Sequence, residues 1–85
     1  MSYTIEYTTS ALRELRSLDR QVQQRISERI ENLSENPLPL GVKKFQGEAN
    51  HWRIRVGDYR VIYRIDRQRI VVTIVRVAHR REVYR

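Results

Sequence analysis

The stretch from residue 51 to residue 85 constrains the fold most, because it predicts two consecutive β-hairpins followed by a short basic tail. In the first hairpin, apolar residues alternate with arginines on both sides of the turn pair Gly57-Asp58. If these two residues form the whole loop, the register of the strands follows. The expected cross-strand pairs are Val56 with Tyr59, Ile54 with Val61, Trp52 with Tyr63, Arg55 with Arg60 and Arg53 with Ile62.

This register gathers the large apolar side chains on one face of the hairpin and the arginines on the other. We call the second surface the arginine face, and its residues are Arg53, Arg55, Arg60 and Arg64. Like charges directly across a strand pair, as at Arg55 and Arg60, destabilise the pair by up to about 1 kcal/mol. A solvated face that happens to use arginine is one explanation, but a docked polyanion explains the cluster better.

The net charge of +7 comes entirely from the second part of the chain. Residues 1 to 50 hold seven Lys or Arg and seven Asp or Glu, whereas residues 51 to 85 hold ten Arg and three Asp or Glu. Planar guanidinium groups suit bidentate phosphate contacts and stacking on bases. The distribution therefore points first to nucleic acid, then to an acidic protein and last to an anionic membrane.

The N-terminal part predicts one short strand and two helices. Residues 3 to 7 alternate between apolar and polar, which indicates a strand that joins the later sheet. A helical apolar pattern covers about Ser10 to Ser17, and Asp19 can cap a second helix that ends at Asn36-Pro37. We expect the two helices to pack as an antiparallel hairpin on the apolar face of the sheet.

Residues 36 to 50 hold both prolines and two of the three glycines, so they are predicted to be a loop. Residues 70 to 75 are apolar on both faces, which is typical of a central strand. The order β-α-α-β-β-β predicts an α+β fold over residues 1 to 85, as one domain. Its small, mostly antiparallel sheet is expected to carry the helical hairpin on one face and the arginines on the other.

Several classes of site are disfavoured by composition. The chain has no cysteine and only two histidines, His51 and His79, so disulfides, thiolate sites and histidine-rich metal sites are not expected. We expect neither a metal nor another cofactor. No apolar run approaches the roughly 20 residues that span a bilayer, and residues 1 to 10 lack the features of a signal peptide. We therefore expect a cytosolic protein with no membrane partner.

The pattern W-R-I-R-V-G-D-Y-R-V-I-Y, with H-R-R-E-V-Y-R after a valine-rich strand, resembles the RelE branch of the RelE/ParE superfamily of type II toxins. The resemblance covers essentially the whole chain. It implies an endoribonuclease that enters the ribosomal A site and cuts mRNA there. It also implies a cognate antitoxin that holds the toxin inactive, with operator DNA bound only as part of the antitoxin complex.

By position, the resemblance assigns the catalytic residues. They are Arg53 and Arg55 on the first hairpin strand, Arg60 in the G-x-Y-R segment, Arg80 after the last strand and Tyr84 near the C-terminus. The hairpin has arginines where well-known members use lysines. The candidate RNA-binding residues are Lys43, Lys44, Arg64, Arg81 and Arg85. The two lysines are interpreted either as part of the basic surface or as plainly solvated loop residues.

The chemistry of RNA cleavage suits these residue types. The 2′-hydroxyl is the nucleophile, so cleavage needs in-line positioning, a proton acceptor, charge stabilisation and a proton for the leaving oxygen. Arg60 and Arg80 would neutralise the phosphate, while Arg53 and Arg55 would orient the backbone. A free tyrosine has a pKa of about 10, so Tyr84 can act as the base only among guanidinium charges.

Other interpretations stay open at this stage. Tyr84 can instead stack on a base, and His79 is expected to have a positioning or solvent-facing role. The basic tail either folds along the arginine face or frays. The whole chain can also be a ParE-like poison of DNA gyrase without nuclease chemistry, or a non-catalytic nucleic-acid-binding module.

Overall fold

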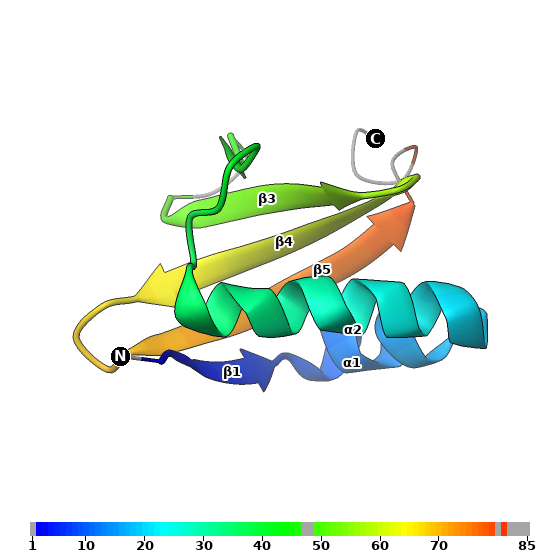
Figure 1. The fold of residues 1–85 in the computed structure, drawn as a ribbon, viewed down its shortest axis with the longest axis horizontal. Helices are drawn as coiled ribbons and strands as arrows, with labels where there is room; N and C mark the ends of the chain where they lie inside the picture. Colours follow the sequence, from blue (N-terminus) through cyan, green and yellow to red (C-terminus); the bar gives the residue numbers. More distant parts are fainter. Residues whose placement is uncertain (1, 47–48, 80, 82–85) are drawn as a thin grey trace.

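The computed structural model describes residues 2–46, 49–79 and 81, and its five strands form one sheet in the order β1-β5-β4-β3-β2 (Figure 1). Strand β1 runs parallel to β5, and all other neighbours are antiparallel. The predicted α+β fold is confirmed. The elements in chain order are β1 (Thr4–Tyr7), α1 (Thr9–Arg16), α2 (Arg20–Glu35), β2 (Lys43–Lys44), β3 (His51–Val56), β4 (Tyr59–Asp66) and β5 (Val71–His79).

The β3–β4 hairpin has the predicted register at every position. Gly57 adopts a φ of +60°, which only glycine adopts without steric cost, and this allows the tight two-residue turn with Asp58. The observed pairs are Val56 with Tyr59, Arg55 with Arg60, Ile54 with Val61, Arg53 with Ile62 and Trp52 with Tyr63. The hairpin therefore has one apolar face and one arginine face.

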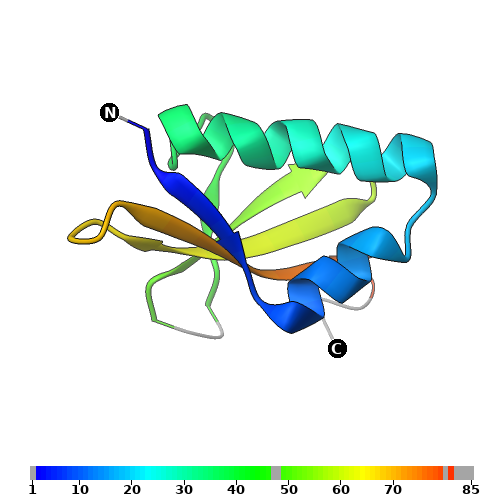
Figure 2. The same ribbon diagram turned by 90° about the horizontal axis from the view of Figure 1, so that it is seen from below.

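Helix α2 lies as a separate layer across the apolar face of the sheet (Figure 2). Its apolar stripe, spaced by three and four residues, faces inward and is shielded from solvent. The core lies between this helix, α1 and the sheet. Its buried members are Ala11, Leu15, Ile26, Ile30, Leu33, Ile54, Val56, Val61, Tyr63, Val72, Ile74 and Val77.

Helix α1 packs along β5 at the point where β1 ends. The pairing of β1 with β5 stops at Tyr7 and Ile74, and the chain then enters the helix at Thr8. Beyond that point Glu14 of α1 accepts a 2.8 Å hydrogen bond from the backbone N–H of Val77. The same carboxylate lies 3.4 Å from Nε of Arg76. A side chain thus completes the edge of β5 that β1 leaves open.

Two local features were not predicted. The loop between α2 and β3 contains the two-residue strand β2, which pairs with β3. Strand β5 begins at Val71 rather than at Ile70, because Ile70 belongs to the preceding turn with a φ of 58°. The carbonyl of Ile70 accepts a 2.9 Å hydrogen bond from Thr4 N, which aligns β1 with β5.

Within the described residues, no helix is both long and apolar enough to cross a membrane.

Tyr63 joins the sheet to the end of α2. Its ring is fully buried in the core, and its hydroxyl donates a 2.6 Å hydrogen bond to the carbonyl of Pro37, just beyond the helix. Burial raises the pKa of Tyr63 far above its usual value of 10.0. The folded state therefore strongly favours the neutral phenol.

We expect Tyr63→Phe to lower the free energy of unfolding by about 1 kcal/mol at neutral pH, because the hydrogen bond to Pro37 is lost. The stability contributed by the raised pKa is fully present below about pH 10 and falls at higher pH, since the unfolded tyrosine then ionises first. Urea denaturation at pH 7 and above pH 10 tests both effects. The variant should lose less stability at high pH than the wild type does. If the variant and the wild type lost the same stability at high pH, the pH dependence would not come from Tyr63.

Candidate functional site

A small cavity lies on the arginine face beside the edge strand β2. Its volume is about 160 Å³, and strands β2, β3 and β4 all contribute to it. Among the described residues that line it, four are basic and none is acidic. We call it the basic cavity, and its lining residues are Gly41, Lys43, Arg53, Ile54, Arg55 and Arg60.

Strand pairing brings the basic side chains of this cavity together. Arg55 lies directly opposite Arg60, and Lys43 lies directly opposite Arg53. Neighbours directly across a strand pair project to the same face of a sheet. Positive charges from three strands therefore converge on one small volume, which concentrates a field that attracts anions.

Two of the arginines are held in place by local contacts. Nε of Arg55 donates a 3.0 Å hydrogen bond to the carbonyl of Gly57 in the hairpin turn. Arg60 is partly buried, and its terminal nitrogen Nη1 is shielded from solvent. A guanidinium that is oriented before a ligand arrives loses less conformational entropy on binding.

Ile62 forms an apolar floor within the arginine face. It lies between Arg60 and Arg64 along β4, opposite Arg53 on β3 and Arg76 on β5. Although it is on the face away from the core, Ile62 is only 3% exposed. The aliphatic stems of the surrounding arginines pack along such a residue while their charged ends stay accessible.

The structure brings only some of the predicted site residues together. Arg53, Arg55, Arg60 and Lys43 line the basic cavity, as described above. Lys44 pairs with Trp52, so it projects to the other side of β2 from Lys43. Arg64 lies further along β4, outside this cavity. Arg81 is exposed, and the predicted residues Arg80, Tyr84 and Arg85 lie outside the described part of the chain.

His79 is held at the end of β5 by two contacts. Its ring packs edge-on against Tyr59, with ring centroids 5.5 Å apart, and its Nδ1 accepts a 3.3 Å hydrogen bond from the backbone N–H of Arg81. The ring thus contacts the start of β4 and the backbone of Arg81, two residues beyond the end of β5. Either a positioning or a solvent-facing role was expected for His79 from the sequence, and that expectation stays a prediction.

The basic cavity can bind an anion and stabilise additional negative charge on it. Its described lining offers cations and backbone groups, but none of the carboxylate, imidazole or phenol side chains that accept protons in catalysis. The described residues contain no cluster of three His, Cys, Asp or Glu side chains suited to a metal ion. Phosphate binding and charge stabilisation are therefore the chemistry that this part of the site supplies.

Sequence reasoning missed a second, larger hollow at the far end of β4. Its volume is about 530 Å³, and it includes Trp52, Arg64 and Arg67. The sequence pattern placed Trp52 only on the core face and indicated no role for Arg67. The sequence does contain a signal for this hollow. The turn after β4 holds Arg67 and Arg69, and β4 pairs with β3, which carries Trp52.

Residues 5–84 match the family model described as the ParE toxin of the type II toxin-antitoxin system parDE. The chain belongs to the RelE/ParE toxin family. It is also 37% identical to Toxin RelG of Mycobacterium tuberculosis over 86 residues, which is 100% of this chain and 99% of the relative. That relative is named as a toxin, which agrees with the resemblance to toxins of the RelE/ParE superfamily.

Solved structures of RelE toxins have the same fold. The RelBE2 toxin-antitoxin complex of Mycobacterium tuberculosis matches with a TM-score of 0.82 and 36% identity, covering 93% of this chain and 99% of that one. The RelE-RelB complex of Pyrococcus horikoshii matches with a TM-score of 0.81 and 29% identity, covering 94% and 97%. This protein is therefore a RelE-type toxin by sequence and by fold.

We expect Arg55→Thr to raise the free energy of unfolding by about 0.5 kcal/mol at low salt, because it removes the like charge opposite Arg60. The gain should shrink at high salt, since both groups are near the surface and are screened. Urea denaturation at two salt concentrations measures this. The matched control is Arg64→Thr, because Arg64 lies opposite His51 of β3 and not opposite another arginine. Equal effects of the two substitutions would refute a repulsive Arg55–Arg60 pair.

Proposed function

We propose that this toxin is an mRNA interferase that cleaves mRNA in the ribosomal A site. The observation that supports the proposal most is the basic cavity, where Arg53, Arg55 and Arg60 converge with Lys43 and no acidic residue is among the described lining. A phosphate group is the ligand that matches such a set of charges. The resemblance to RelE toxins supports mRNA as its source.

The proposed mechanism uses the nucleophile that RNA carries. The 2′-hydroxyl attacks the adjacent phosphorus atom, a bond to the 2′-oxygen forms, and the bond to the 5′-oxygen breaks to leave a 2′,3′-cyclic phosphate. The attacking hydroxyl loses its proton to a base, and the 5′-oxygen gains one from an acid. No water or metal is consumed in this step.

Each described arginine has a distinct part in this mechanism. Arg60, with one terminal nitrogen buried, contacts the non-bridging phosphate oxygens and stabilises the charge of the transition state. Arg53 and Arg55 hold the RNA backbone so that the attacking and leaving oxygens are in line. The base is assigned to Tyr84 and a further phosphate contact to Arg80, both on the basis of the family resemblance.

The proposed regulator is a cognate antitoxin. The related toxins of Mycobacterium tuberculosis and Pyrococcus horikoshii were both solved in complex with RelB-type antitoxins. An acidic or amphipathic antitoxin segment that covers the arginine face would neutralise its charge and block RNA. Operator DNA would be bound through the antitoxin in that complex.

The match to the ParE toxin model supports a second candidate function, the inhibition of DNA gyrase without nuclease chemistry. The two functions predict different responses in the cell. An interferase stops translation promptly, whereas a gyrase poison induces the response to DNA damage. The arginine face would then be a binding surface only.

The decisive experiment is cleavage of a defined mRNA on ribosomes with an empty A site, with the cut positions mapped by primer extension. We expect wild-type protein to cut within the A-site codon. Arg60→Ala should lower the cleavage rate by at least about a hundredfold, as expected for the loss of a transition-state charge contact. Tyr84→Phe should also lower it strongly if the phenol is the base.

The matched control for this assay is Arg29→Ala, which removes one exposed positive charge from α2. It should leave the rate within about twofold of wild type. Equal losses in Arg60→Ala and Arg29→Ala would mean that only net charge matters. If wild-type protein cuts nothing and gyrase is inhibited instead, the interferase proposal is wrong.

We expect expression of the toxin alone to arrest growth, and co-expression with the cognate antitoxin to restore growth. Arg60→Ala expressed alone should be tolerated, because the proposed charge contact is missing. Growth curves and incorporation of a labelled amino acid measure both effects. Robust growth of cells that make folded wild-type protein alone would count against toxicity.

A further inference from the structure

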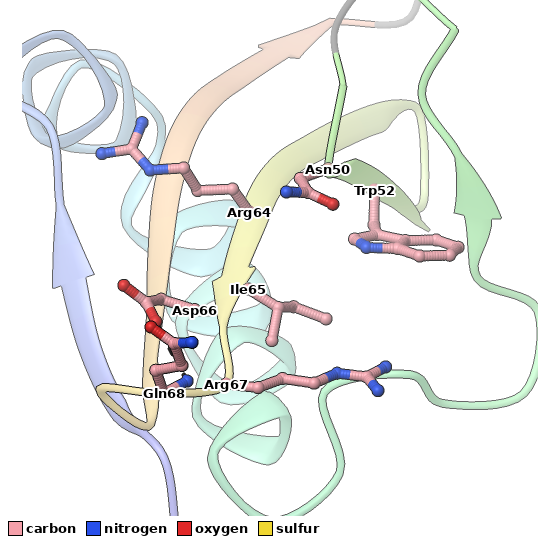
Figure 3. Close-up of a pocket in the computed structure, with 7 residues that line it drawn as sticks. All are labelled: Asn50, Trp52, Arg64, Ile65, Asp66, Arg67 and Gln68. Carbon is pink, nitrogen blue, oxygen red and sulfur yellow. Dashed lines mark hydrogen bonds between the residues drawn. The ribbon is translucent and has the colours of Figure 1, made fainter.

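The larger hollow at the end of β4 combines an aromatic ring, an amide and positive charge. Figure 3 shows the indole of Trp52 facing Ile65 across an open space, with Asn50 and Arg67 at opposite rims. We call it the Trp52 hollow. Its lining residues are Asn50, Trp52, Arg64, Ile65, Asp66, Arg67 and Gln68.

The hollow lies next to the end of the arginine face. Arg60, Ile62 and Arg64 follow one another on the same side of β4, so the line of basic residues runs from the basic cavity to Arg64. Trp52 projects from β3 to the opposite side, because it pairs with the core residue Tyr63. Since Arg64 and Trp52 both line the hollow, it opens at the end of the sheet where the two faces meet.

The rigid parts of the hollow are set by the fold. Trp52 is partly buried and packs against the core, so one part of its indole is fixed while the rest remains accessible. The carboxylate of Asp66 accepts hydrogen bonds from the backbone N–H groups of Gln68 and Arg69, at 3.1 and 3.0 Å. These bonds order the turn that carries Arg67 and direct the negative charge of Asp66 to the backbone.

The chemistry of the lining fits a nucleotide. A partly exposed indole offers a flat surface for a base, and an arginine beside it offers charge to the neighbouring phosphate. The amide of Asn50 supplies both a donor and an acceptor at the rim, which can bind the edge of a base. The volume of about 530 Å³ lies within the range of sites that enclose small organic ligands.

We propose that the Trp52 hollow binds one unpaired base of single-stranded RNA, a few nucleotides from the phosphate in the basic cavity. The base stacks on Trp52, and Arg67 contacts its phosphate. This inference rests on the proposed function, because it takes RNA as the ligand of the arginine face. It adds a positioning site that fixes how the strand lies along β4.

The chain offers its own probe, because Trp52 is the only tryptophan in the sequence. Its fluorescence therefore reports on this hollow alone. The experiment uses the full chain and a short single-stranded oligouridylate with 2′-O-methyl groups, which cannot be cleaved by 2′-hydroxyl attack. Binding is followed in parallel by the anisotropy of a dye on the RNA and by the emission of Trp52.

We expect RNA to quench the emission of Trp52 with the same midpoint as the rise in anisotropy. Trp52→Leu should weaken binding about tenfold, and Trp52→Phe, which keeps an aromatic ring, should recover most of that loss. Arg67→Ala should weaken binding about fivefold and reduce the dependence on salt. Arg29→Ala, which removes an equal charge from α2, should change binding less than twofold.

Several outcomes would overturn the proposal. RNA that binds by anisotropy without changing Trp52 emission contacts the protein elsewhere. An equal effect of Arg67→Ala and Arg29→Ala excludes a specific phosphate contact. No binding in either readout also refutes it. If an antitoxin peptide changes the emission and RNA does not, the hollow is a protein interface instead.

Cleavage on the ribosome separates this inference from the proposed function. If wild-type protein cuts mRNA but RNA does not change the emission of Trp52, only the proposal that the hollow binds RNA is wrong. If RNA quenches Trp52 and the ribosomal assay shows no cut, the hollow binds RNA and the interferase proposal fails. Circular dichroism of Trp52→Leu and Trp52→Phe checks that both variants fold.

Discussion

The register of the β3–β4 hairpin is the constraint on which the rest of the molecule depends. The turn at Gly57-Asp58 pairs Trp52 with Tyr63 on the core face, and it pairs Arg55 with Arg60 on the other. A slip by one residue would exchange the two faces and bury the arginines under α2. Burying unpaired charges costs far more than a small domain can supply, so this hairpin tolerates only one pairing.

Strand β5 has hydrogen-bonding partners on both of its sides. Strand β5 pairs with β4 along almost its whole length and with β1 over its first half. Where β1 ends, α1 takes over, and Glu14 satisfies the N–H of Val77. The carboxylate does so without adding free negative charge near the arginine face, because Arg76 lies within 3.4 Å of it. The Glu14 side chain thus satisfies the part of the β5 edge that a longer β1 would otherwise have to pair.

Local patterns predicted what depends on neighbouring residues. Alternation and turn chemistry gave the hairpin pairing, and helical spacing gave α2 with its buried stripe. The first helix begins at Thr9, one residue earlier than expected, because the side chain of Thr8 accepts a 3.1 Å hydrogen bond from the N–H of Ala11. Asp19 stands at the start of α2 as predicted, but within the described structure its side chain makes no capping hydrogen bond.

Features that depend on distant contacts were not predictable from the sequence. Two lysines carry no strand signal, and β2 exists only because β3 offers an unpaired edge to it. That pairing places Lys43 on the arginine face and Lys44 on the face that carries Trp52. The Trp52 hollow likewise needs β3 and the turn after β4 to be side by side. Of the candidate site, the hairpin arginines could be predicted from the strand pattern, whereas the cavity that unites them with Lys43 depends on the fold.

The arginine face and the core face place opposite demands on the same two strands. The core face packs tightly and favours folding, whereas Arg55 and Arg60 repel each other on the arginine face and oppose folding. An anionic ligand relieves that repulsion, so its binding stabilises the folded state. An RNA phosphate and an acidic antitoxin segment would both do this at the basic cavity, and there they exclude each other. A segment that covers this cavity alone would leave the Trp52 hollow at the other end of β4 open. Under the proposed function, complete inhibition would require an antitoxin that blocks the phosphate site itself, since a base bound in the hollow alone would not position RNA for cleavage.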